Sequence, residues 1–70
     1  MDYTEEDLKE AQRQISSTLQ KLRRAAETLE TKENPDRYKS QITLAKRRIR
    51  AFEISLDLLQ REIEQKKEKA

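Results

Sequence analysis

Residues 38–63 read YKSQITLAKRRIRAFEISLDLLQREI, and this stretch decides the fold. Its apolar residues recur in alternating steps of four and three: Tyr38, Ile42, Ala45, Ile49, Phe52, Leu56, Leu59 and Ile63. A strict seven-residue repeat is typical of a helix that packs against a second helix with a left-handed supercoil. The stretch therefore predicts a long amphipathic helix that needs a helical partner.

The strongest break in the chain is Asn34-Pro35, directly before this stretch. Asn is a good N-cap residue, and Pro is preorganised for the first helical position. We therefore expect a helix over about 35–66. The residues before it, 31–34, form a short connection, and short connections join antiparallel neighbours.

The N-terminal half predicts the partner helix, over about 5–30. Thr4 is its candidate N-cap, and the acids that follow it complement the positive end of the helix dipole. Tyr3 and Leu8 fit a hydrophobic staple around that cap. Large apolar residues recur every seven positions, and small ones follow the first three of them by three: Leu8, Ile15, Leu22 and Leu29, then Ala11, Thr18 and Ala25. We expect both sets to face the second helix.

These elements predict an all-α protein, a single domain over 1–70 that folds as an antiparallel two-helix hairpin. Below about 70–80 residues, one core rarely supplies more than about 3–5 kcal/mol. The chain has no Cys and no His, so disulfides and Cys–His zinc sites are unavailable to it. Oligomerisation remains as the source of further stability.

A second apolar stripe on the C-terminal helix supplies a surface for this. Leu44, Ala51 and Leu58 are seven residues apart, with Ile54 between them. At about 100° per residue they lie roughly opposite the first seam. The alternative is scattered surface leucines, which are common. We expect the stripe to pack, most simply in a homodimer that forms a four-helix bundle.

Two sequence blocks, 11–26 and 37–50, contain basic residues and no acid, and carry formal charges of +4 and +6. Folding the chain about residues 32–33 would place residue i beside 65 − i and merge the blocks into one electropositive band. Such a band is typical of nucleic-acid binding, although it is also compatible with a solvated face. The candidate contacts are Arg23, Arg24, Lys46, Arg47, Arg48 and Arg50.

Composition excludes several function classes. Without Gly there is no phosphate-cradling loop, and without Cys or His there is no thiol nucleophile or haem ligand. Glu53 and Asp57 share a helix face, but such pairs are usually solvated surface acids. We expect no catalytic residue, metal or cofactor. No apolar run is long enough for a membrane span, so we expect a cytoplasmic protein without membrane contact.

Two stretches carry a resemblance: Ile15-Ser16-Ser17-Thr18, and residues 47–59, which read RRIRAFEISLDLL. They resemble a group of small two-helix proteins of Gram-positive bacteria with no known activity. The resemblance implies a bacterial cytosolic protein and implies no reaction.

Two functions follow as expectations. The first is a non-enzymatic helical interaction module that associates with itself and binds a protein partner through its apolar stripes. The alternative is an RNA- or DNA-binding accessory protein that uses the basic band. Contacts of this second kind would be directed to the phosphate backbone and steeply salt-dependent.

Overall fold

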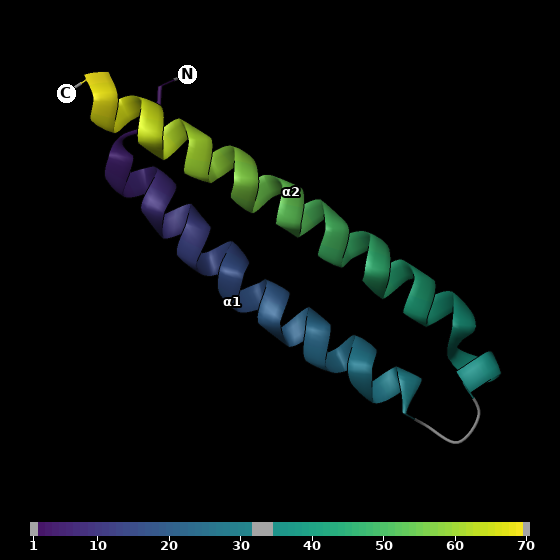
Figure 1. Ribbon diagram of the computed structural model, residues 1–70. Coiled ribbons are helices and arrows are strands. Elements are labelled where there is room, and N and C mark those ends of the chain that lie inside the picture. The colour runs from purple at the N-terminus through teal and green to yellow at the C-terminus, as the bar shows by residue number, and fades with distance from the viewer. Residues whose placement is uncertain (1, 32–34, 70) are drawn as a thin grey trace.

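The computed structural model describes residues 2–31 and 35–69, which form two antiparallel helices lying side by side (Figure 1). Helix α1 spans Glu5–Glu30, a short 3-10 helix η1 spans Pro35–Tyr38, and α2 spans Lys39–Lys69. These described ranges contain no strand. The predicted all-α two-helix hairpin is confirmed, with both ends of the chain at the same end of the molecule (Figure 1).

Helix α1 begins at the predicted residue because its cap satisfies two backbone amides. The Asp7 amide donates to Thr4 Oγ1 over 3.0 Å, and the Thr4 amide donates to Asp7 Oδ2 over 3.1 Å. This reciprocal pair is a capping box, with Asp7 in the place that Glu or Gln usually takes. Local sequence chemistry is sufficient to set this end of the helix.

Replacing Thr4 by Ala should remove one half of the capping box. Loss of an N-cap costs about 1 kcal/mol, which lowers the Tm of a domain of this size by about 4–8 °C. Thermal unfolding followed by circular dichroism measures the change. Thr43→Ala, at an exposed position inside α2, is the matched control and should not lower the Tm. Equal Tm values for Thr4→Ala and the unchanged chain would contradict the role of the cap.

The start of the second helix differs from the prediction. The expected helix over 35–66 opens as the 3-10 turn η1, and α-helical geometry begins only at Lys39 and continues to Lys69. Turns of 3-10 helix are frequent at helix N-termini and in connections. Asn34, the predicted N-cap, lies outside the described residues. Since η1 packs against both helices, it belongs to the connection as much as to α2.

The seam of α2 is confirmed along its full length. Each of its eight predicted positions is buried or half-buried, and Ile63 is 2 % exposed. The residues of α1 that are buried against it are Leu8, Leu19 and Ala26. The core of the hairpin is therefore one row of side chains between two helices, mostly aliphatic, with the aromatic rings of Tyr38 and Phe52 half-buried among them.

The predicted small-residue half of the α1 seam is wrong at two of its three positions, whereas Ala11 is half-buried as predicted. Thr18 and Ala25 are exposed, whereas their neighbours Leu19 and Ala26 are 4 % and 5 % exposed. The residues that face α2 follow Leu8, Ile15 and Leu22 by four positions instead of three. Burying Leu19 in place of Thr18 removes more apolar surface from water, which favours this rotation of α1.

The register of the two helices also differs from the prediction. Ala11 and Leu59 line one hollow and Ala25 and Ala45 another, and direct contacts join Gln12 to Gln60 and Arg23 to Glu53, so facing residue numbers add to about 70–76, not 65. The reason is the 3-10 turn, which lengthens the connection and moves the fold point from residues 32–33 to about 35–38. The block 11–26 consequently lies beside residues that follow about 44, and only its end meets the second basic block.

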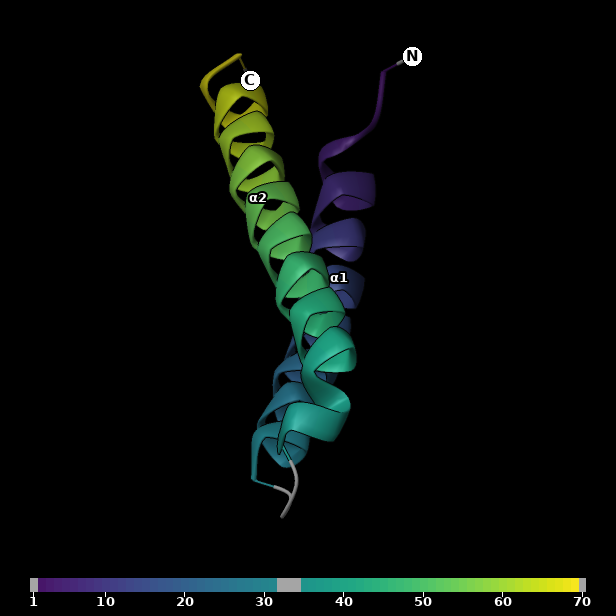
Figure 2. The same cartoon turned by 90° about the vertical axis from the view of Figure 1, so that its right-hand side faces the viewer.

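The molecule is long and thin. Its principal extents are 53 × 18 × 15 Å, and its radius of gyration is 15.9 Å, against about 11 Å for a globular chain of this length. Figure 2 shows that the helices cross at a shallow angle and separate toward the end that holds both termini. A rod of two helices has no interior beyond its seam, so most of its surface stays in water.

Candidate partner-binding face

One edge of the hairpin is closed by three polar contacts between the helices. Gln12 donates to Gln60 over 2.7 Å, Arg23 donates to Glu53 over 2.9 Å, and Lys46 Nζ lies 3.2 Å from Glu30 Oε1. The α2 members of these pairs are seven residues apart, so they lie on one edge of the helix. We call this edge the polar flank.

The opposite edge is hollowed and apolar. One hollow of about 410 Å³ is lined by Tyr3, Asp7, Leu8, Ala11 and Leu59. A second, of about 250 Å³, lies between α1 and α2 nearer the connection, and its lining includes Leu22, Ala25, Leu29, Leu44, Ala45 and Arg48. In each helix, residues that line one hollow lie two heptads away in sequence from residues that line the other. Residues two heptads apart lie on the same side of a helix, so both hollows lie along the same edge of the hairpin. We call this edge the open flank.

Small side chains create the open flank. Ala11 and Ala25 of α1 stand where a larger side chain would bridge to α2. The sequence prediction placed both residues in the inner seam and so missed this position. The signal that could have located them was the run Ile15, Leu19, Leu22, Ala26 and Leu29, which has the same alternating steps of four and three as the seam of α2.

The outer stripe of α2, made of Leu44, Ala51, Ile54 and Leu58, is exposed. Leu44, Ile54 and Leu58 are 48 %, 45 % and 58 % exposed, and Ala51 is exposed as well. Leu44 also lines the hollow that contains Ala25, so the stripe adjoins the open flank at this point. The outer stripe and the open flank therefore meet at Leu44, and we call the two together the binding face.

The six candidate nucleic-acid residues are in two different situations. Arg23 and Lys46 form ion pairs with acids of the opposite helix. Within residues 2–31 and 35–69, the other four form no salt bridge and are exposed: Arg24, Arg47, Arg48 and Arg50.

The free arginines do not line a single surface. Arg24 stands two residues from both Leu22 and Ala26, so it lies on the side of α1 turned away from α2. Arg48 borders the hollow of the open flank. The register leaves at most residues 44–50 beside 20–26, so the two basic blocks overlap only at their ends and do not merge along their length.

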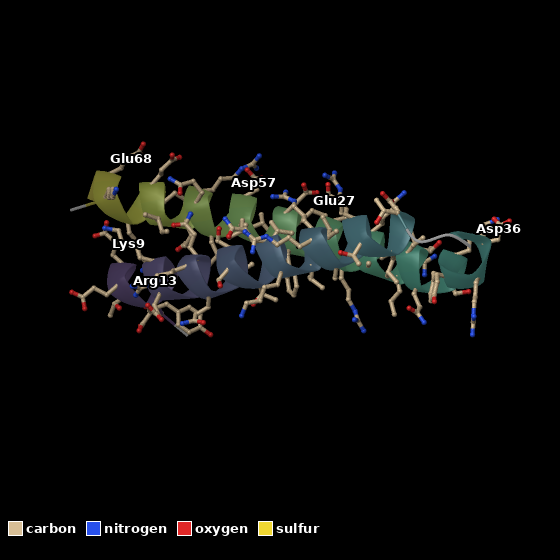
Figure 3. The ribbon with its side chains drawn as sticks, turned by 90° about the horizontal axis from the view of Figure 1, so that it is seen from below. Lys9, Arg13, Glu27, Asp36, Asp57 and Glu68 are labelled. Carbon is tan, nitrogen blue, oxygen red and sulfur yellow. The ribbon has the colours of Figure 1, made fainter. Side chains whose placement is uncertain are left out.

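Glu53 and Asp57, the two carboxylates considered for catalysis, each form an ion pair with a different arginine. Glu53 pairs with Arg23 of α1, and Asp57 pairs with Arg61 over 3.2 Å. Figure 3 shows Asp57 projecting outward from α2. In the part of the chain that the structure describes, no group of three or more acidic residues is placed to hold a metal ion.

No protein-family model matches the chain, and no curated protein or solved structure is significantly similar to it. In the described ranges, neither helix combines the length and the apolar character that crossing a membrane requires.

Proposed function

We propose that this protein is a non-enzymatic interaction module that binds a protein helix on its binding face. The supporting observation is the contrast between the two edges of the hairpin. Polar contacts close one edge, whereas the other leaves two hollows beside leucine side chains that are about half exposed. An amphipathic helix fits such a surface because its apolar residues at intervals of three and four enter the hollows.

The energetics favour a partner on this face. Each leucine or isoleucine of the outer stripe is about half exposed, so its complete burial would contribute about half of the roughly 1.5–3 kcal/mol that a fully exposed side chain gains. The hairpin itself is near the lower limit of size for independent stability. Binding therefore supplies free energy that the isolated chain lacks.

Site-specific photo-crosslinking in living cells tests which face is occupied. A photoreactive phenylalanine analogue at Leu58 should give discrete adducts, because this position lies on the binding face. The same analogue at Ser17 is the matched control. Ser17 is exposed and stands two residues from both Ile15 and Leu19, which places it on the outward side of α1. Equal adduct yields at the two positions, or none at either, would refute the proposal.

Nucleic-acid binding is a second candidate, supported by the four free arginines and the acid-free block 37–50. Four phosphate contacts would weaken binding by about a hundredfold between 50 and 200 mM salt. Fluorescence anisotropy with mixed-sequence RNA and DNA measures this dependence.

For that measurement, replacing Arg24, Arg47, Arg48 and Arg50 by Gln should abolish binding without lowering helicity. Lys9→Gln with Arg13→Gln, near the acidic N-terminal end, is the control. Absence of binding at 50 mM salt would exclude nucleic-acid binding, so that protein binding would be the one proposed function that remains.

A further inference from the structure

We infer that the occupant of the binding face is a second copy of this chain, with the two α2 helices antiparallel and a two-fold axis near Ala51. This inference rests on the proposed function, because it uses the same face. It adds the identity and the direction of the partner helix.

The exposed area of the chain supports a dimer. The hairpin exposes 5958 Å², whereas a compact monomer of 8.4 kDa exposes about 4,600 Å². The excess of about 1,300 Å² is larger than the roughly 800 Å² per partner that a stable interface buries. Docking two hairpins along their length would bring the exposed area per chain to that of an ordinary small protein.

The charges along α2 select the antiparallel direction. Residues 37–50 carry six basic residues and no acid, whereas residues 52–65 carry four acids and one base, a formal charge of −3. A parallel copy would place Arg47 and Arg48, which stand beside the outer stripe between Leu44 and Ala51, against their own equivalents. An antiparallel copy places each basic half against the acidic half of its partner, and like charges facing each other are disfavoured.

The outer stripe is self-complementary in that direction. Leu44 and Leu58 are equidistant from Ala51, so a two-fold axis there sets Leu44 of each copy against Leu58 of the other. Ala51 meets its own equivalent, and its small side chain allows the helices to approach closely at the axis. The hollow beside Leu44 then lies where the second hairpin packs, which gives a four-helix bundle.

The absence of native cysteine allows a direct test by disulfide trapping. A residue on a two-fold axis faces its own equivalent, so Ala51→Cys should form an intermolecular disulfide under mild oxidation. Ser17→Cys, on the outward side of α1, is the control. We expect Ala51→Cys to cross-link more than about tenfold faster, because paired thiols are held at millimolar effective concentration.

A mixing experiment determines whether the two α2 helices are antiparallel or parallel. Leu44→Cys and Leu58→Cys should each cross-link slowly alone and rapidly when mixed, because position 44 of one copy meets position 58 of the other. Rapid cross-linking of each variant alone would indicate parallel helices and would overturn the inference. Cross-linking of Ala51→Cys at the rate of the Ser17→Cys control would also overturn it.

Sedimentation equilibrium separates this inference from the proposed function. A mass of twice 8.4 kDa for the unchanged chain supports the dimer. A monomer whose Leu58 position still forms adducts with another protein in cells would refute the second copy as occupant and leave the interaction module standing. A monomer without such adducts would refute both.

Discussion

Leu19→Ala is expected to unfold most of the hairpin at micromolar concentration. Leu19 is 4 % exposed and occupies the middle of the α1 seam. Truncating a buried leucine costs about 2–5 kcal/mol, which is comparable to the roughly 3–5 kcal/mol that a core of this size supplies. Urea unfolding followed by circular dichroism at 222 nm measures the loss.

The neighbouring Thr18→Ala is the control for this prediction. Thr18 is exposed, so its replacement should change the free energy of unfolding by no more than about 0.5 kcal/mol. The two variants also test the rotation of α1 about its axis. A larger loss of unfolding free energy for Thr18→Ala than for Leu19→Ala would indicate that Thr18 lies in the seam, and it would contradict the observed packing.

Leu44→Lys combined with Leu58→Lys should convert the protein to a monomer. In the two-fold arrangement the double variant removes four leucines per dimer, and burying the exposed half of each contributes about 0.8–1.5 kcal/mol. A loss of about 3–6 kcal/mol weakens the dimer Kd by roughly two to four orders of magnitude. Light scattering at several protein concentrations measures the mass directly.

The control for the double variant adds the same two charges elsewhere. Ser17→Lys with Gln20→Lys changes two exposed residues of α1 that do not belong to the binding face. This variant should keep the mass of the unchanged chain. An unchanged mass for Leu44→Lys with Leu58→Lys would show that the outer stripe is an ordinary exposed surface.

The two proposed functions compete for the same part of α2. Arg47 and Arg48 lie between Leu44 and Ala51, so a second hairpin docked on the outer stripe would cover their surroundings. Arg24, on the outward side of α1, would stay accessible in the dimer. Nucleic-acid binding that weakens as the protein concentration rises would therefore indicate that dimerisation hides the arginines of α2.

The polar flank contributes more to register than to stability. The Arg23–Glu53 and Lys46–Glu30 pairs are about half exposed, and surface ion pairs of this kind contribute about 0–1 kcal/mol each. The residue numbers of both pairs nevertheless add to 76, so both support an alignment shifted from the sum of 65 that the sequence predicts. They also remove two cations from the surface that the sequence assigned to nucleic-acid contacts.

The sequence by itself determined that the chain forms two helices, where the first of them begins, and the seam of α2. The Thr4 cap acts within a few residues of chain, and the α2 repeat leaves only one apolar face long enough to be the seam. These features depend on local hydrogen bonding and on helix periodicity, which no distant residue has to complete. Reading along the chain is therefore sufficient to predict them.

Only the tertiary structure decided the rotation of α1 and the register. Helix α1 has apolar or small residues both three and four positions after Ile15 and Leu22, so two seams were compatible with its sequence. They differ by the rotation of one residue, about 100°. The burial of Leu19 shows which of the two seams forms, and the 3-10 turn at Pro35–Tyr38 determines the register of α1 against α2. Both depend on how α1 and α2 fit together in space, and they decide which residues form the open flank.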